Sequence, residues 1–169
     1  LNTLFKLEST VAGEGFVLDV SGLIGQYAHG NEPSHHTAYF FAFAGQPWRT
    51  QELVREIFDT QYKNKPDGLC GNDDCGQMSA WYLFSAMGFY PFNPCNDGYV
   101  FGAPQLPKVT LNLAGGRTLT IEAKDISKAN KYVQSITLDG KPVDGLKISH
   151  EAVMRGGRLV FAMGPQPKK

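Results

Sequence analysis

Hydrophobic and polar positions up to about residue 95 follow the period of α-helices. A first helix is predicted with Pro33 in its first turn and the apolar run 37–44 after it, and Gly45 is suited to end it in a left-handed conformation. A second helix is predicted over 51–62, with Thr50 as its N-cap and one apolar stripe along its length. A third is predicted over 77–87, where a glycine follows directly. This part of the chain is therefore expected to be helical.

After residue 95 apolar and polar residues alternate, which is typical of strands in hairpins. The alternation predicts strands at 109–113, 119–123, 134–138, 147–150 and 158–163. Asp139-Gly140 is a strong signal for a two-residue turn, and a further turn is expected near Gly156-Gly157. Residues 1–28 are weakly patterned and are expected to be mostly loop, whereas the tail over 165–169 is expected to be disordered.

The predicted fold class is α+β, with helices over 1–95 and a small antiparallel β-rich region over 96–169. The first and third helices are apolar on all sides and the second is amphipathic, as in a two-layered ring of helical hairpins. With antiparallel neighbours, the first and third helices run the same way. The polar loops that precede them are therefore expected to lie at the same end.

Three helices cannot close such a ring, so many of their aromatic side chains would remain exposed to water. Each exposed apolar side chain forgoes roughly 1.5–3 kcal/mol. We therefore expect the chain to be the C-terminal portion of a larger protein. The remaining helices of the ring would be its partners, and the isolated chain is expected to self-associate in a non-native way.

Composition narrows the classes of function. The formal net charge of zero gives no electrostatic reason to expect nucleic acid or an anionic membrane surface as a partner. No apolar run approaches the ~20 residues that membrane insertion requires. Among the three cysteines, a Cys70–Cys75 disulfide is conceivable, but three thiols are the favoured interpretation.

The segment 71–77 carries paired carboxylates and an amide in a glycine-bounded loop before an apolar helix. Adjacent acids repel each other, so such loops typically serve a metal, a proton or a water molecule. Asp74 is the strongest candidate for chemistry, because a carboxylate near a helix N-terminus is held ionised. The alternative is that Asp73 or Asp74 only caps the helix. Capping accounts for one acid, not for the cluster that Asn72 completes.

The segment 29–36 is a second polar loop. Asn31 and Glu32 together resemble half of the oxygen shell of a hard cation, although Glu32 alone would be an ordinary helix-dipole partner. The histidines of this loop lack the spacing of a zinc site, and we expect them to hydrogen-bond the loop backbone or to line a polar pocket. Trp81 is positioned either to stack on a sugar face or to pack between helices.

Four segments of the chain, in order, resemble the C-terminal end of the glycoside hydrolase family 92 exo-α-mannosidases. They are His29-Gly30-Asn31-Glu32-Pro33-Ser34-His35-His36, Ala44-Gly45-Gln46-Pro47-Trp48, Gly71-Asn72-Asp73-Asp74-Cys75-Gly76-Gln77-Met78-Ser79-Ala80-Trp81-Tyr82 and Met87-Gly88-Phe89-Tyr90-Pro91. The resemblance implies a secreted or periplasmic enzyme. It also implies an N-terminal β-sandwich packed on an (α/α)6 toroid, of which this chain would supply the last helices.

The resemblance further implies calcium-dependent hydrolysis of terminal mannose from N-glycans or mannan, with inversion and with α-1,2 linkages as the default. Asp74 would be the general base, with Asp73 as a helper. Asn31 and Glu32 would bind Ca2+.

Asn72, where some family members carry a second aspartate, would contact the sugar together with His29 and Trp81. The catalytic acid would lie upstream, so the isolated chain is expected to be inactive. The alternative is a non-catalytic carbohydrate-binding or interaction module built on the hairpin-rich region.

Overall fold

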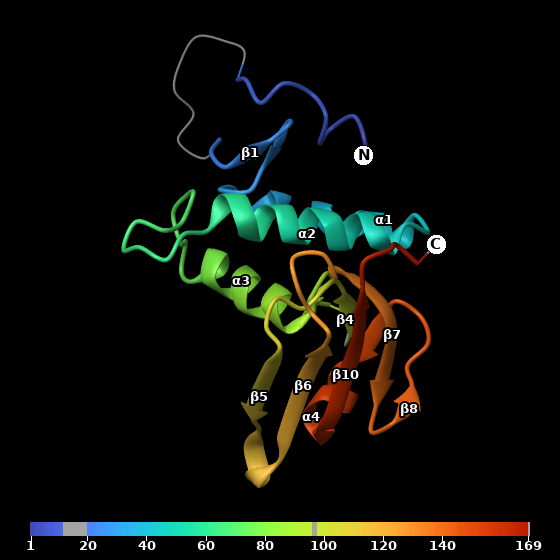
Figure 1. The fold of residues 1–169 in the computed structure, drawn as a ribbon. Helices are drawn as coiled ribbons and strands as arrows, with labels where there is room; N and C mark the ends of the chain where they lie inside the picture. The colour runs from blue at the N-terminus through green and yellow to red at the C-terminus, as the bar shows by residue number, and fades with distance from the viewer. Residues whose placement is uncertain (12–19, 96–97, 169) are drawn as a thin grey trace.

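The computed structural model describes residues 1–11, 20–95 and 98–168. Most helical segments lie across one end of a twisted sheet, a later short helix lies beside the strands, and a short N-terminal hairpin covers the far side of the longest helix (Figure 1). This hairpin pairs β1 (Leu23–Ile24) with β2 (Tyr27–Ala28) in an antiparallel manner. The mixture of helices and strands agrees with the predicted α+β character.

The first predicted helix is broken into three short pieces. Two 3-10 turns, η1 (Glu32–Ser34) and η2 (Thr37–Tyr39), lead into the single helical turn α1 (Phe40–Phe43). Gly45 has a φ of 72° and follows α1, as predicted for a left-handed terminus. The expectation of one continuous helix is therefore wrong. The i→i+3 bonds of 3-10 turns are less favourable than those of an α-helix, so such turns stay short, as observed here.

The second helix, α2 (Pro47–Gln61), begins earlier than predicted. Pro47 occupies its first turn, where a missing N–H costs nothing. Thr50 is not the N-cap but a buried helical residue whose hydroxyl donates to the Ala38 carbonyl oxygen at 2.9 Å. The predicted apolar stripe is confirmed, because Leu53, Val54 and Ile57 are all buried.

The third helix, α3 (Gln77–Met87), has the predicted bounds. It begins after Gly76 and ends at Gly88, both in the left-handed region with φ values of 90° and 98°. The direction of the first segment is also as predicted. Its residues meet α3 in the same order, since His35 contacts Gln77 and Tyr39 contacts Ser85 further along. The ends that carry the polar loops therefore lie together.

Most strands form a five-stranded sheet in the order β5-β6-β10-β7-β8. Its strands are β5 (Lys108–Asn112), β6 (Thr118–Lys124), β7 (Tyr132–Leu138), β8 (Lys141–Pro142) and β10 (Gly157–Gly164), with the 3-10 turn η3 (Ala114–Gly116) between the first two. Asp139 and Gly140 form the predicted tight turn between β7 and β8, both with positive φ.

The prediction of a purely antiparallel region is wrong, because β10 pairs with β6 in a parallel manner. The predicted hairpin at Gly156-Gly157 does not form. Instead, a helix α4 (His150–Arg155) separates β9 (Lys147–Ser149) from β10 and carries the chain between two sheets. Ser149 caps this helix, since its hydroxyl accepts from the Ala152 N–H at 3.1 Å.

A three-stranded sheet joins the two parts of the molecule. It contains β3 (Phe89–Tyr90), β4 (Gly98–Phe101) and β9, in that order. Successive side chains of a strand point to opposite faces. Tyr90 and Val100 accordingly pack into the helical core, whereas their neighbours Phe89 and Phe101 pack into the core of the larger sheet. The change of pattern near residue 95 therefore falls inside one shared layer.

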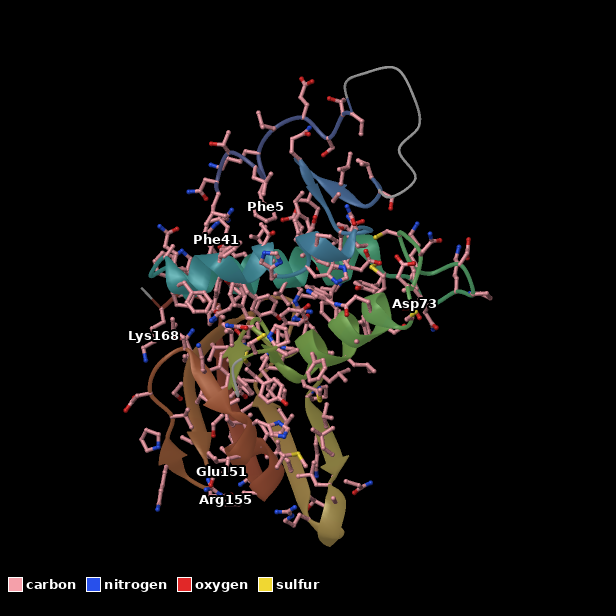
Figure 2. All side chains as sticks on the ribbon, turned by 180° about the vertical axis from the view of Figure 1, so that it is seen from behind. Phe5, Phe41, Asp73, Glu151, Arg155 and Lys168 are labelled. Carbon is pink, nitrogen blue, oxygen red and sulfur yellow. The ribbon has the colours of Figure 1, made fainter. Side chains whose placement is uncertain are left out.

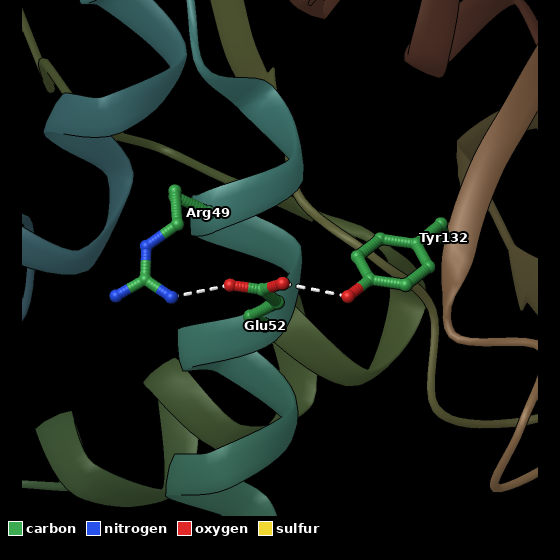
Figure 3. A network of polar contacts seen from close by, with 3 residues as sticks. All are labelled: Arg49, Glu52 and Tyr132. Atoms are coloured by element: carbon green, nitrogen blue, oxygen red, sulfur yellow. Dashed lines mark hydrogen bonds and ion pairs between the residues drawn. The ribbon is translucent and has the colours of Figure 1, made fainter. Parts of the chain in front are cut away.

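Polar contacts also connect α2 to the larger sheet. Glu52 accepts a hydrogen bond from the Tyr132 hydroxyl at 2.6 Å and forms an ion pair with Arg49 (Figure 3). Beside this bond, the N–H of Val133, the residue after Tyr132 on β7, donates to the side-chain oxygen of Gln51, the residue before Glu52 on α2, at 3.0 Å. These bonds fix the helix against β7 at the edge of the apolar contact.

Two further expectations concern the tail and the cysteines. Residues 165–168 lie along Gln134, whose side chain donates to the Gln166 carbonyl and whose own carbonyl accepts from Lys168. This part of the tail is therefore ordered, contrary to the expectation of a disordered tail. Lys169 lies outside the described residues. Cys70, Cys75 and Cys95 are free thiols, as favoured. Within the described ranges, no helix is long and apolar enough to cross a membrane.

Candidate active site

The two polar loops, residues 29–36 and 71–77, are in direct backbone contact. A Cβ atom on Gly71 would lie 2.7 Å from the carbonyl oxygen and 2.8 Å from the Cα of Gly30. Any residue other than glycine would therefore push the loops apart. Figure 2 shows Asp73 at the end of α3, well away from the Glu151 and Arg155 end of the molecule. The predicted convergence of the two loops is confirmed; we call this region the acid end.

The acid end brings the carboxyl groups of Glu32 and Asp74 together. Hydrogen bonding to Glu32, together with partial desolvation and the Glu32 and Asp73 charges, raises the pKa of the Asp74 carboxyl above its usual range. This is the opposite of the expected effect of the helix N-terminus, because the neighbouring carboxyl of Glu32 favours the protonated form. Asp74 is exposed, whereas the Glu32 Oε1 atom is buried and has no hydrogen-bond partner among the described residues. Two carboxyl groups this close together favour a shared proton or a cation between them.

The loop that carries Asp74 has an uncommon backbone. Asp74 and Cys75 adopt positive φ values of 44° and 58°, and Gly76 follows at 90°. Aspartate tolerates this region better than most residues, but a run of two non-glycine residues there is costly. Strain of this kind is found where the position of a side chain matters more than local stability.

Asp73 has a capping role. Its two carboxylate oxygens accept hydrogen bonds from the Ser79 N–H at 2.9 Å and from the Ser79 hydroxyl at 3.1 Å. Gly76 is at the N-cap position and has no side chain that could accept a hydrogen bond from the first turn of α3. The capping alternative therefore describes Asp73, and its carboxylate is engaged inside the loop rather than directed at a ligand.

His29 and Trp81 are both fully buried at 0 % exposure. A sugar cannot reach either side chain, so their predicted role as direct substrate contacts is corrected. Trp81 stacks parallel to Tyr62 with ring centroids 6.0 Å apart, and its indole N–H donates to the His35 carbonyl. The packing alternative for Trp81 is the one observed. Asn72, by contrast, is exposed at the acid end.

The hydrogen bonds of His29 fix its tautomer. The Tyr62 hydroxyl donates its one proton to the Met78 carbonyl at 3.1 Å, so it must accept from His29 Nε2 at 2.7 Å. His29 Nδ1 then accepts from the Tyr27 hydroxyl at 2.8 Å. Every polar atom of the ring is satisfied only when the ring is neutral. Burial, with a smaller contribution from His35, lowers the pKa of His29 to about 3.

A stability prediction follows from His29. In the unfolded chain a histidine titrates near 6.5, so below that pH the unfolded state takes up a proton that the folded state does not. Between pH 7 and pH 5 we expect this group alone to lower the free energy of unfolding by about 2 kcal/mol, and the loss to continue down to about pH 3. Urea unfolding at the two pH values measures it.

The matched control is His29→Gln, which does not titrate. Its free energy of unfolding is lower at both pH values, but its loss between pH 7 and pH 5 should be smaller than that of the wild type by the same amount, about 2 kcal/mol. Equal losses in the two proteins would show that His29 takes up its proton as an exposed histidine does.

The oxygen atoms at the acid end fit part of a site for a hard cation. Glu32 offers a buried, unpartnered carboxylate oxygen, Asp74 lies beside it, and the Asn31 side chain makes no capping bond to η1. Carboxylate and amide oxygens are the ligands that Ca2+ prefers. No group of three or more His, Cys, Asp or Glu side chains suited to a metal occurs in the part of the chain that is described. The described residues therefore supply only part of the oxygen shell that such a cation needs.

An open hollow of about 800 Å3 lies elsewhere, between α2, α3 and the segment that links them. Residues of the two polar loops do not line it. Its wall includes Leu83 and Leu106, which are 60 % and 44 % exposed. Large apolar side chains left in water agree with the expectation that these helices need further covering.

The sequence did not single out two side chains that hold the acid end together, Gln77 and Tyr62. The pattern assigns Gln77 no contact with the other loop, yet its side chain reaches His35 of that loop at 3.2 Å. Tyr62 follows the last residue of α2 and contacts both His29 and α3. The prediction that loop histidines bond the backbone is confirmed for His35, whose Nε2 lies 2.9 Å from the His29 carbonyl oxygen.

Solved structures of two mannosidases resemble the fold of this chain. A family GH92 α-mannosidase from Bacteroides thetaiotaomicron, in complex with mannoimidazole, matches 99% of the chain with a TM-score of 0.92 and 38% identity. An inverting GH92 mannosidase from the same species matches 85% with a TM-score of 0.78 and 40% identity. The chain spans 22% and 19% of these two proteins.

Sequence comparison gives the same family. An uncharacterized secreted glycosidase of Arthroderma benhamiae is 30% identical over 140 residues, which are 81% of this chain and 18% of that protein. The model of the glycosyl hydrolase family 92 catalytic domain matches residues 1–165. The chain therefore belongs to glycosyl hydrolase family 92.

Proposed function

We propose that this chain supplies the base side of the active site in a secreted or periplasmic exo-α-mannosidase. The enzyme would remove terminal mannose from N-glycans or mannan with inversion, would depend on Ca2+ and would prefer α-1,2 linkages. The observation that carries the proposal is the backbone contact between Gly30 and Gly71, which brings the loops of Glu32 and Asp74 together from distant parts of the sequence. Membership of a family of glycoside hydrolases, including α-mannosidases, supports the reaction type.

Asp74 is the group suited to activate water. It is exposed at the acid end, so a water molecule and a sugar can both approach it. In an inverting hydrolysis, the base accepts a proton from water while the water oxygen bonds to the anomeric carbon. An acid on the other face then protonates the departing glycosidic oxygen, with the two carboxyl groups ~6.5–9.5 Å apart. Glu32 is too close to Asp74 to be that acid, because the two carboxyls interact directly.

Glu32 and Asn31 are the residues that would hold calcium, with Asp74 beside them. Bound calcium would polarise the sugar hydroxyls by its positive charge. The chain's own contribution is to hold Glu32 half-buried as the first residue of η1, with an Oε1 atom that has no hydrogen-bond partner among the described residues. Asn72 is exposed on the same loop as Asp74 and is placed to bond a sugar hydroxyl.

The catalytic acid and the remaining sugar contacts would come from outside this chain, which spans about a fifth of the matched proteins. We propose that these parts include the other helices of an (α/α)6 toroid and a β-sandwich. The exposed apolar residues around the hollow, Leu83 and Leu106 among them, are consistent with such packing.

Proton NMR of the first product tests the proposal. The intact protein that contains this chain is expected to release β-mannose first from an α-linked mannobiose, because inversion exchanges the anomeric configuration. Removing calcium with a chelator should abolish the reaction, and adding calcium back should restore it. Release of α-mannose, or full activity in the chelator, would contradict the inverting or the calcium-dependent part of the proposal respectively.

A further inference from the structure

A hydrogen-bonded link connects the two polar loops without using either carboxyl group. His35 is almost fully buried at 1 % exposure, and its Nε2 faces the His29 carbonyl oxygen at 2.9 Å. Because a carbonyl only accepts, Nε2 carries the proton and Nδ1 of the neutral ring must accept. The donor that reaches Nδ1 is the side-chain amide of Gln77, at 3.2 Å.

Each of these two residues is bonded through its backbone to one residue of the acid pair. The His35 N–H donates to the Glu32 carbonyl oxygen at 2.9 Å, and the Gln77 N–H donates to the Asp74 carbonyl oxygen at 3.2 Å. The contacts therefore close a ring. It passes from Glu32 to His35, across the side-chain bond to Gln77, back to Asp74, and through the carboxyl contact to Glu32.

The ring is anchored on rigid elements. Gln77 is the first residue of α3, and its amide also donates to the Tyr90 hydroxyl at 3.4 Å. The His35 carbonyl accepts from the Trp81 indole N–H at 3.1 Å, one turn further along α3. Because both residues are held in this way, the hydrogen bond between Gln77 and His35 keeps the two loops at a defined distance from each other.

We propose that His35 and Gln77 are positioning residues, whose mutual hydrogen bond sets the separation between the Glu32 and Asp74 carboxyl groups. In this role both residues act through the loops that carry the two carboxyl groups, and His35 is buried away from any ligand. The inference rests on the proposed function, because it holds that His35 and Gln77 keep the proposed base, Asp74, at the right distance from the proposed cation ligand, Glu32. Misplacement by ~1 Å of a group that acts in the transition state costs about 100-fold in rate.

The Gln77 side chain allows a test in which the protein still folds. It is only partly buried, and the Trp81 bond to the His35 carbonyl remains when the amide is removed. Gln77→Met keeps the length and helix propensity of the side chain but removes the donor. Gln77→Glu keeps the shape and can only accept when ionised, so it cannot donate to His35 Nδ1.

Kinetics of the intact protein on an aryl α-mannoside provide the first readout. Both variants are expected to lower kcat by about 10- to 100-fold with KM changed less than threefold. The matched control is Tyr39→Phe, which removes the fully buried hydrogen bond to Ser85 at 2.8 Å, away from the acid end. It should lower the melting temperature at least as much as the Gln77 variants and leave kcat within twofold. If the Gln77 variants also keep kcat within twofold, the proposal is wrong.

A crystal structure of the Gln77→Met variant provides a readout that does not depend on activity. We expect the Glu32 and Asp74 carboxyl groups to lie further apart in the variant than in the wild type. An unchanged separation would overturn the positioning role even if kcat falls. If the wild type does not cleave mannosides, the proposed function fails, and the separation still decides whether His35 and Gln77 set the spacing.

Discussion

Replacing Asp74 by asparagine in the intact protein is expected to lower kcat by about 10²- to 10⁴-fold, the range that a general base contributes. The change removes the proton acceptor and little else. Asparagine tolerates the positive φ of 44° at this position, so the loop keeps its shape. Steady-state kinetics on an aryl α-mannoside, with thermal unfolding in parallel, measure the effect.

Asp73→Asn is the matched control for this substitution. The amide oxygen still accepts from the Ser79 N–H, so the cap is largely kept and kcat should change little. A loss as large as that of the Asp74 variant would make Asp73 the base, or a necessary helper. The non-catalytic alternative, a carbohydrate-binding module, predicts that Asp74→Asn leaves hydrolysis intact and weakens binding only.

Replacing Trp81 by alanine is expected to lower the free energy of unfolding by about 3–5 kcal/mol, as for other large buried aromatic side chains. Its indole is 0 % exposed and lies 4.5 Å, centroid to centroid, from the His29 ring in an edge-on arrangement. The substitution therefore opens a cavity and also leaves the His35 carbonyl without its donor. Urea unfolding followed by far-UV circular dichroism measures the loss.

Tyr82→Ala serves as the comparison, because Tyr82 is the next residue on α3 and is 37 % exposed. Its loss should be clearly smaller than that of Trp81→Ala. If Trp81→Ala instead kept its stability and raised KM, Trp81 would face the sugar and the packing described for it would be wrong.

Local signals predicted the elements whose ends are set by special residues. α3 was predicted with its observed bounds because glycines with left-handed backbone stand at both ends. The start of α2 was missed because Thr50 is a good N-cap by type, whereas Pro47 in the first turn was the better signal. α4 was missed although Ser149 before it and Gly156 after it are both terminus signals.

The alternation of apolar and polar residues does not predict which strands pair when they are far apart in the sequence. The parallel contact between β6 and β10 joins segments that are separated by three other strands and a helix, and no local pattern marks a partner. The convergence of Glu32 and Asp74 was predictable because it follows from helix direction alone. The burial of His29 was not, since it depends on hydrogen bonds to Tyr27 and to Tyr62, which lies in a distant segment. For Trp81 the sequence offered packing between helices as one of two interpretations, and packing is observed.

The strand pair β3–β4 has a consequence for how the protein matures during synthesis. Val100 completes the helical core while Phe101 beside it belongs to the other core, and β4 is held in place by β9, which is translated later. A ribosome delivers the chain from its N-terminus, and domains fold as units once they have emerged. The loops that bear Glu32 and Asp74 precede β9 in the sequence, so we expect them to reach their final shape only after β9 has been made.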